Sequence, residues 1–209
     1  MDAPRTRTRH SGGVAGPGNE VVAVRHGETA WTVSGQHTGR TDIPLTEAGR
    51  RHGALLATRL RGRSFARVLT SPLSRAWDTA RLAGLAAEAE PCDDLLEWDY
   101  GDYEGRRTVD IRRERPGWTL WDGGVPHGET AEDVGRRVDR VIAAVREAEG
   151  DVALFSHGHL LRVLAARWVG LRPADGRRMA LAPGALSVLG WEREAPVIVR
   201  WNQLWTGTG

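Results

Sequence analysis

The chain has no lysine: all 29 basic residues among its 209 are arginine. This absence excludes Schiff-base catalysis, attachment of pyridoxal phosphate and the lysine-containing loop that binds phosphate in many nucleotide-binding proteins. If the chain binds phosphate, arginine must therefore supply the charge that holds it.

Cysteine is almost absent too. The single Cys92 excludes an internal disulfide and a metal site made of several cysteines, so we expect a reduced thiol that packs as a small apolar residue. No apolar run approaches the ~18 residues of a membrane helix. Residues 1–19 are basic and rich in glycine and proline, which predicts a disordered tail and no signal peptide. We expect a cytoplasmic protein with no membrane partner.

An excess of charge of one sign is also missing. The 29 basic residues face 27 acidic ones, a formal net charge of +2, and no segment concentrates arginine as a nucleic-acid groove would. We expect no nucleic-acid partner, and a homodimer is left open. The length suits one domain, placed at residues 20–205.

Apolar runs alternate with amphipathic stretches along the chain. The runs predict strands within 21–26, 66–71, 151–157, 185–191 and 196–201. The amphipathic stretches predict helices over 45–60, 72–85, 130–148 and 159–169, with Thr46, Ser71 and Thr130 as N-caps and Asp133 completing a capping-box-like pair. This alternation predicts an α/β fold of three layers, α/β/α, with a mostly parallel central sheet. Residues 100–128 show no clear period, and we expect an excursion over the sheet edge.

The five residues HGETA occur twice, at 26–30 and at 127–131. The first copy directly follows a predicted buried strand and Arg25, whereas the second follows the turn signal GGVP and leads into a helix at Thr130. Ligands bind at the carboxyl ends of strands in an open parallel sheet. The first copy is therefore the better candidate for chemistry. In the second, His127 is expected in a loop near the crevice, and Glu129 is either a partner of the site or a solvated carboxylate.

Two further segments are expected at the same end of the sheet. His157 ends the strand at 151–157, and Arg75 lies in the first turn of the helix at 72–85. Two histidines, two arginines and a helix N-terminus suit a dianionic phosphate, and one imidazole can attack phosphorus while the charges hold the transferring group. Arg25, Arg75 and a protonated His157 would supply the positive charge that a metal otherwise brings, so we expect no metal and no cofactor.

The remaining histidines and the tryptophans favour ordinary roles. We expect His159 to pack or to form a hydrogen bond and not to join His157 in a metal site. His10, His37 and His52 are expected at the surface, with His37 alone near a substrate. Four tryptophans are expected to anchor packing: Trp118, Trp121, Trp168 and Trp201.

Four stretches resemble motifs of the histidine phosphatase superfamily, also called the phosphoglycerate mutase-like family. They are RHGETAW at 25–31, SPLSRAWDTA at 71–80, LLEWDYGDYEG at 95–105 and FSHGHLLRVLA at 155–165. The resemblance covers about residues 20–205. It implies that His26 is the phosphorylated nucleophile, that Arg25, Arg75 and His157 form the phosphate pocket, and that Glu97 gives the leaving group its proton. Asp99, Asp102 and Glu104 are rivals of Glu97, which the resemblance ranks first.

The resemblance also implies residues that bind the substrate. Thr38 and Gly39 match the loop that closes over it, and Gly158 follows the second histidine. Tyr100, Tyr103 and Glu104 are expected to line the opposite wall, with ordinary packing as the alternative for the tyrosines. The chain departs from the family at Thr32, where many members carry an asparagine that touches the phosphate, and the Thr32 hydroxyl is expected to replace one of those contacts.

Several stretches are most similar to the branch of fungal sedoheptulose-bisphosphatase-type enzymes, among them SGQHTGRTDIPLT at 34–46. This similarity implies a phosphomonoesterase acting on a small phosphate ester, either a sugar phosphate or a bisphosphate. The alternatives are a phosphoglycerate-type mutase and a noncatalytic phosphate-binding module. Five arginines in the excursion are candidates for contact with a second anionic group: Arg106, Arg107, Arg112, Arg113 and Arg115.

Overall fold

The protein is described by a computed structural model of residues 19–204. A central sheet of six strands runs through it, in the order β3-β2-β4-β1-β5-β6. The strands are β1 (Val21–Arg25), β2 (Arg67–Thr70), β3 (Ala89–Pro91), β4 (Val152–Ser156), β5 (Leu186–Glu192) and β6 (Ala195–Gln203). The first four are parallel, while β5 pairs antiparallel with β1 and with β6. The predicted mostly parallel sheet is confirmed.

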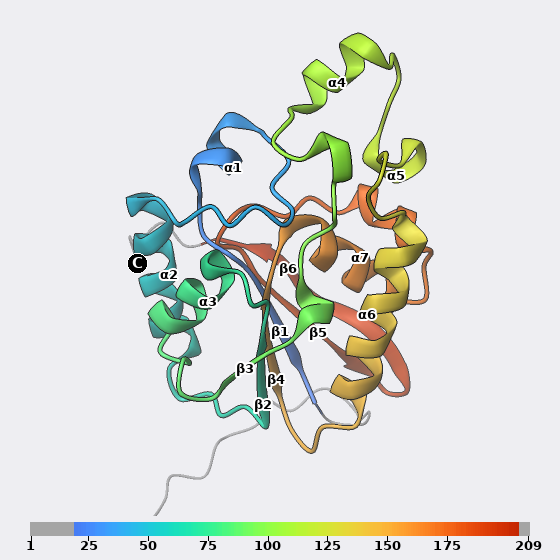
Figure 1. Ribbon diagram of the computed structural model, residues 1–209. Coiled ribbons are helices and arrows are strands. Elements are labelled where there is room, and N and C mark those ends of the chain that lie inside the picture. Colours follow the sequence, from blue (N-terminus) through green and yellow to red (C-terminus); the bar gives the residue numbers. More distant parts are fainter. Residues whose placement is uncertain (1–18, 205–209) are drawn as a thin grey trace, which may run out of the picture.

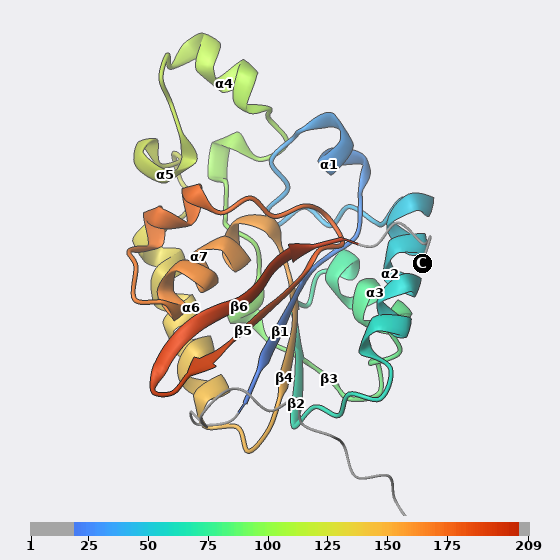
Figure 2. The same ribbon diagram turned by 180° about the vertical axis from the view of Figure 1, so that it is seen from behind.

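Helices cover both faces of this sheet, which confirms the three-layer α/β/α prediction. Figures 1 and 2 show α2 and α3 on one face and α6 and α7 on the other. The α-helices are α1 (Ala30–Ser34), α2 (Glu47–Leu60), α3 (Ser74–Leu82), α4 (Thr108–Glu114), α5 (Leu120–Gly123), α6 (Ala131–Arg146) and α7 (Gly158–Trp168). Short 3₁₀ turns span Asp93–Leu95, Gly101–Tyr103 and Pro173–Arg178.

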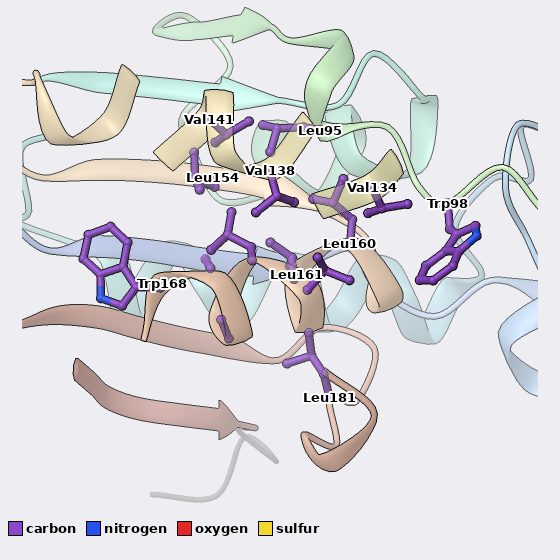
Figure 3. Packing of buried hydrophobic residues seen from close by; sticks show 14 of the residues in the cluster. Leu95, Trp98, Val134, Val138, Val141, Leu154, Leu160, Leu161, Trp168 and Leu181 are labelled. Carbon is purple, nitrogen blue, oxygen red and sulfur yellow. The ribbon is translucent and has the colours of Figure 1, made fainter. Parts of the chain in front are cut away.

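Side chains of each strand alternate between two apolar clusters, one on each face of the sheet. In β4, Leu154 joins the cluster under α6 and α7, whereas Phe155 joins the cluster under α2 and α3. Figure 3 shows Val134, Val138 and Val141 of α6 packed with Leu154 and with Leu160 and Leu161 of α7. A strand buried on both faces needs apolar residues at consecutive positions, which explains the uninterrupted runs in β1 and β4.

The predicted helix starts are confirmed in two cases and wrong in one. Thr46 caps α2, and Thr130 with Asp133 forms a capping box at the start of α6. However, α3 begins at Ser74, and Ser71 does not cap it. The Asp42 carboxylate accepts the Ser74 N–H at 3.0 Å instead, so a distant loop supplies the cap.

The excursion at 100–128 differs from the expectation in two ways. It contains the helices α4 and α5, which are too short to show a period in the sequence. It also lies, together with α1, above the carboxyl ends of the strands and not along an edge strand (Figures 1 and 2). The segment is therefore placed to form the outer wall of a site at those strand ends.

Other sequence expectations have mixed outcomes. Residues 1–18 of the predicted tail lie outside the described part, but Asn19 is buried and donates to Val145 O at 2.8 Å, so the domain begins one residue earlier than predicted. Cys92 packs against the larger apolar cluster, and burial raises the pKa of its thiol. The four tryptophans all pack within or against that cluster, as expected.

Candidate active site

A cavity of about 270 Å³ opens at the carboxyl ends of the strands. Its wall includes seven of the ten residues predicted to be catalytic or to bind the substrate: Arg25, His26, Thr32, Thr38, Glu97, Tyr100 and Gly158. Neighbouring strands bring Arg25 and Gly158 together, because Arg25 of β1 lies opposite Ser156 of β4, two residues before Gly158. His157, Arg75 and Gly39 are not in the wall; the two charged or ionisable side chains lie fully buried behind it.

His26 has the geometry of a neutral nucleophile. Its Nδ1 lies 2.7 Å from the Gly27 carbonyl oxygen, which can only accept, so Nδ1 carries the proton and Nε2 the lone pair. Burial, with the charges of Arg75 and Arg25, holds the pKa of His26 well below its ordinary value. The imidazole is therefore uncharged at neutral pH, and Nε2 is available to attack an electrophile in the cavity.

His157 stands directly behind His26, with ring centroids 5.1 Å apart. Its Nδ1 accepts from Arg75 Nε at 3.2 Å, and its Nε2 pairs with the Ser71 hydroxyl at 2.8 Å. Burial and the charge of Arg75 hold its pKa well below the ordinary value. The protonated His157 expected from the sequence is thus wrong for this structure, because Arg75 already donates to the nitrogen that would take the proton.

Arg75 holds the loop after α1. Besides His157, it donates to the carbonyl oxygens of Thr41 at 2.9 Å and Gly39 at 2.7 Å, and more weakly to that of Thr38 at 3.3 Å. The Glu104 carboxylate also holds this loop: it accepts the backbone N–H of Gly39 at 2.9 Å and that of Thr41 at 3.1 Å. The expected place of Glu104 in the substrate wall is therefore wrong: its carboxylate fixes the loop.

Gly39 can approach the Glu104 carboxylate closely because it has no side chain. A Cβ there would lie 2.6 Å from Glu104 Oε2 and 2.7 Å from Trp98 O, too close for any other residue. The role of Gly39 in this structure is close approach of the loop, and not a place in the cavity wall. Thr38, its neighbour, does line the cavity.

Arg25 presents a donor that the protein leaves unused. Its Nη1 donates to Leu181 O, while its buried Nε has no hydrogen-bond partner within residues 19–204. Gly158 makes room for it, since a Cβ at Gly158 would lie 3.1 Å from Arg25 Cζ. A largely buried guanidinium with an unused N–H, in the same cavity wall as His26, favours an anion there.

Glu97 is the one acidic residue in the cavity wall among the described residues. Its Oε1 accepts the N–H groups of Trp98 and Leu160, both at 2.9 Å, and its Oε2 accepts that of His159 at 3.0 Å. The N-terminus of α7 thus fixes the carboxyl group, and Oε2 keeps an acceptor position for a proton.

The rivals of Glu97 are engaged elsewhere. Asp99 Oδ1 accepts from Gly101 N at 2.9 Å, and Asp102 pairs with His127 at 3.0 Å. Glu104 holds the loop described above. His127 is 84% exposed in its side chain and lies outside the cavity wall, as the loop reading of the second HGETA copy predicts.

Three predicted substrate contacts turn out differently from one another. The Thr32 hydroxyl donates to Thr29 O and accepts from Thr29 N, both at 2.9 Å, so helix capping uses the donor proposed for phosphate. Tyr100 lines the cavity, with its OH 2.6 Å from His159 Nδ1. Tyr103 is instead buried away from the cavity and accepts from Arg115 at 3.1 Å, which is the packing alternative.

Sequence reasoning missed part of the wall. Arg162 lines the cavity, and its guanidinium lies 4.7 Å above the Trp121 ring without an acidic partner among residues 19–204. It follows Gly158 by four residues on α7, so helical spacing alone would have placed both on one face. The other unpredicted wall residues are Trp31, Gly35, Gln36, Thr108, His159 and Leu181.

Two histidines complete the wall. His37, expected at the surface and near a substrate, lines the cavity but is largely buried: it packs 4.7 Å from the Tyr100 ring, and burial lowers its pKa to about 4. His159 forms a hydrogen bond with Tyr100, as one of the sequence expectations has it. Within residues 19–204, no three His, Cys, Asp or Glu side chains are grouped so as to hold a metal ion, and no helix is long and apolar enough to cross a membrane.

Curated proteins of known activity are similar to this chain over most of its length. The chain is 41% identical to an acid phosphatase of Mycobacterium tuberculosis over 179 residues, covering 83% of this chain and 87% of that protein. It is 38% identical over 185 residues to sedoheptulose 1,7-bisphosphatase of Saccharomyces cerevisiae, covering 72% of this chain and 67% of the yeast protein.

Solved structures agree. The structure of an open reading frame product from Mycobacterium tuberculosis superposes with a TM-score of 0.84 at 37% identity, covering 89% of this chain and 98% of that one. The family model of the histidine phosphatase superfamily (branch 1) matches residues 21–204, which is all of the described residues except the first two. The chain therefore belongs to branch 1 of the histidine phosphatase superfamily and is a phosphatase.

Proposed function

We propose that the protein hydrolyses a sugar phosphate or sugar bisphosphate through a phosphohistidine on His26. One observation carries this proposal: a neutral imidazole with a free Nε2 lines one cavity together with the guanidinium of Arg25, whose buried Nε has no protein partner, and with a single carboxyl group, Glu97. These are the three parts that transfer of a phosphoryl group from an ester requires: a nucleophile, a charge for the phosphate and an acid for the leaving group.

In the first step His26 Nε2 forms a bond to phosphorus as the ester P–O bond breaks. Arg25 donates to the phosphoryl oxygens, whose negative charge it stabilises. Glu97 Oε2 gives its proton to the departing oxygen, which leaves as an alcohol. His26 Nδ1 keeps its proton throughout and donates it in a hydrogen bond to the Gly27 carbonyl oxygen, which holds the ring in its reactive orientation.

In the second step water replaces the alcohol. The Glu97 carboxylate takes a proton from the water molecule as its oxygen bonds to phosphorus, and the N–P bond breaks to release phosphate and neutral His26. Glu97 ends protonated, as it began. No metal is needed in this scheme, because Arg25, with Arg75 behind it, supplies the positive charge.

A second cavity of about 320 Å³ adjoins the first and favours a sugar as the rest of the substrate. Both cavities share three wall residues: His37, Thr108 and His159. The second is walled by parts of the excursion, including Trp118, Trp121 and Arg112. Aromatic side chains beside a guanidinium suit a polyhydroxylated group that carries a second anion.

Of the five arginines expected to reach a second anion, Arg112 alone lines a cavity. It donates to Trp118 O at 2.8 Å and forms no ion pair within residues 19–204. Three others are paired with Glu114 or Asp110, and Arg115 donates to Tyr103. The named activity of the yeast relative, a sugar bisphosphatase, supports the same substrate class.

The test is chemical trapping with a labelled substrate. Enzyme mixed with sugar phosphate carrying radioactive phosphorus and quenched in base should carry base-stable, acid-labile label on His26, and His26→Ala should carry none. Release of phosphate at full rate without any labelled enzyme under single-turnover conditions would rule out the covalent route. Adding a sugar bisphosphate primer separates a mutase, which returns the phosphoryl group to sugar faster than it releases phosphate.

A further inference from the structure

The second HGETA copy holds a carboxylate that faces the segment carrying Glu97. Glu129 Oε2 accepts the Asp99 N–H at 2.9 Å, and the Glu129 carbonyl oxygen accepts from Trp98 Nε1 at 2.8 Å. The Glu129 N–H in turn donates to Asp99 O at 3.0 Å. Three hydrogen bonds thus join Glu129 to the two residues that follow Glu97.

Arg137 of α6 completes this contact. Its Nε and Nη2 donate to the two Glu129 carboxylate oxygens at 2.7 and 2.8 Å, a bidentate pair in which both side chains are largely buried. The same guanidinium donates to Asp94 O at 2.9 Å, to Leu96 O at 3.0 Å and, more weakly, to Glu97 O at 3.4 Å. One ion pair therefore binds the main chain on both sides of Glu97.

The carboxyl group of Glu97 is held separately, by the N–H groups at the start of α7. Its position is consequently fixed at two points: the side chain by α7 and the backbone by Glu129 and Arg137. Loss of the ion pair removes the Arg137 bonds to the carbonyl oxygens of residues 94, 96 and 97 and leaves the main-chain bonds of Glu129 with Trp98 and Asp99, so the Glu97 backbone gains freedom that its side chain must absorb.

We propose that the Glu129–Arg137 ion pair positions Glu97 for proton transfer to the leaving group. This inference rests on the role of Glu97 in the proposed function. Neither Glu129 nor Arg137 lies in the wall of the cavity, so both act through Glu97 and not by contact with the substrate. A proton transfer depends steeply on distance, and a misplacement of ~1 Å can cost about 100-fold in rate.

A purely structural role for the pair predicts a different result. Loosening of the fold would slow every substrate alike, whatever its leaving group. If the Glu129–Arg137 pair positions Glu97, its loss should slow only those substrates whose leaving group needs a proton from Glu97. A sugar alkoxide needs a proton in order to leave, whereas p-nitrophenolate leaves unaided.

The experiment compares the single-turnover rate of His26 phosphorylation by a sugar phosphate and by p-nitrophenyl phosphate. Variants are Glu129→Gln, Arg137→Lys, Glu97→Gln and the double variant Glu97→Gln with Glu129→Gln. Asp133→Asn is the matched control, because it removes a carboxylate near the start of the same helix that makes no contact with residues 94–99. Arg137→Lys keeps the charge but loses the bidentate geometry, and it serves if Glu129→Gln does not fold.

We expect Glu129→Gln and Arg137→Lys to slow the sugar phosphate by about 10- to 100-fold and p-nitrophenyl phosphate by no more than about threefold. In the Glu97→Gln background, Glu129→Gln should cost no more than about twofold further, since its effect passes through Glu97. The control should resemble the wild type for both substrates.

Equal losses on the two substrates, or a full loss added to that of Glu97→Gln, would overturn the inference while leaving the proposed function intact. If Glu97→Gln itself slowed both substrates equally, Glu97 would not be the acid. The inference would then fail together with that part of the proposed function.

Discussion

Replacing Gly158 with alanine should separate activity from stability. The added Cβ would lie 3.1 Å from Arg25 Cζ and 3.2 Å from Arg25 Nε, inside ordinary contact distance. The guanidinium must therefore move by roughly half an ångström, because a carbon contact is favourable only at ~3.5–4.0 Å. It cannot move without disturbing the bond from its Nη1 to Leu181 O.

The size of the effect follows from what moves. Arg25 Nε is the buried donor without a protein partner, the group that we assign to the phosphoryl oxygens. Losing such a donor outright costs about 100- to 1000-fold, and a shift of a full ångström costs ~100-fold, so half that shift should lower kcat/KM by about tenfold. Stability should change by no more than about 1 kcal/mol, because the helix propensity gained over glycine offsets the disturbed bond from Arg25 to Leu181 O.

The assay pairs steady-state kinetics on a sugar phosphate with urea unfolding. Gly150→Ala is the control: its Cβ would meet Ala66 Cβ at 3.3 Å, an equally close contact, in the loop before β4 and far from the cavity wall. A Gly158→Ala variant that is fully active and normally stable would show that Arg25 does not need its present position. A variant that loses activity only because it unfolds would equally refute the reasoning.

Four further outcomes are expected. His26→Ala should abolish phosphate release while His127→Ala, at an exposed side chain, keeps most of it; similar losses from both would contradict the assignment of the first HGETA copy. Prolonged dialysis against a chelator should leave activity intact, and restoration by zinc or magnesium after its loss would refute the metal-free scheme. Arg112→Gln should lower kcat/KM for a sugar bisphosphate by about tenfold and leave kcat/KM for a sugar monophosphate unchanged. The control Arg106→Gln, which removes the ion pair with Glu114, should change kcat/KM for neither substrate, and an equal loss in the two variants would count against the second cavity as the binding site. Finally, burial holds the pKa values of His26 and His157 well below the 6.5 of an unfolded histidine, so the unfolded chain binds more protons than the folded chain below that pH. Each of the two histidines should therefore lower the free energy of unfolding by up to about 1.4 kcal/mol per pH unit as the pH falls below ~6.5. A denaturant midpoint that stays constant from pH 7 to 5 would refute this.

The sequence predicted the fold where residue patterns are long enough to be periodic. Buried strands such as β1 and β4 need consecutive apolar residues, and α6 repeats its apolar face over 16 residues. The helices α4 and α5 have seven and four residues, too few for a period to appear. The cap of α3 could not be predicted for another reason: Asp42 caps this helix from a loop 32 positions away, and local sequence patterns do not reveal such a contact.

For the site, the sequence predicted which segments meet but not which way each side chain turns. The strand ends brought His26 and His157 together, as expected. Glu104 belongs to the same motif as Glu97, yet it turns to the loop at Gly39 while Glu97 turns to the cavity. Likewise, His157 is uncharged because its Nδ1 accepts a hydrogen bond from Arg75 Nε, a contact between residues 82 positions apart. Such choices depend on the hydrogen-bond network of the folded chain.

Arg75 has a consequence for how tightly the enzyme holds its product. Four of its N–H groups already donate to His157 and to the carbonyl oxygens of the loop at residues 38–41. A phosphate that reaches this guanidinium must compete with the loop for the same donors, so part of its binding energy is lost in displacing these bonds. If Arg75 binds the phosphate as proposed, the loop carbonyls compete with the anion for this guanidinium, and their return to Arg75 would assist the departure of inorganic phosphate.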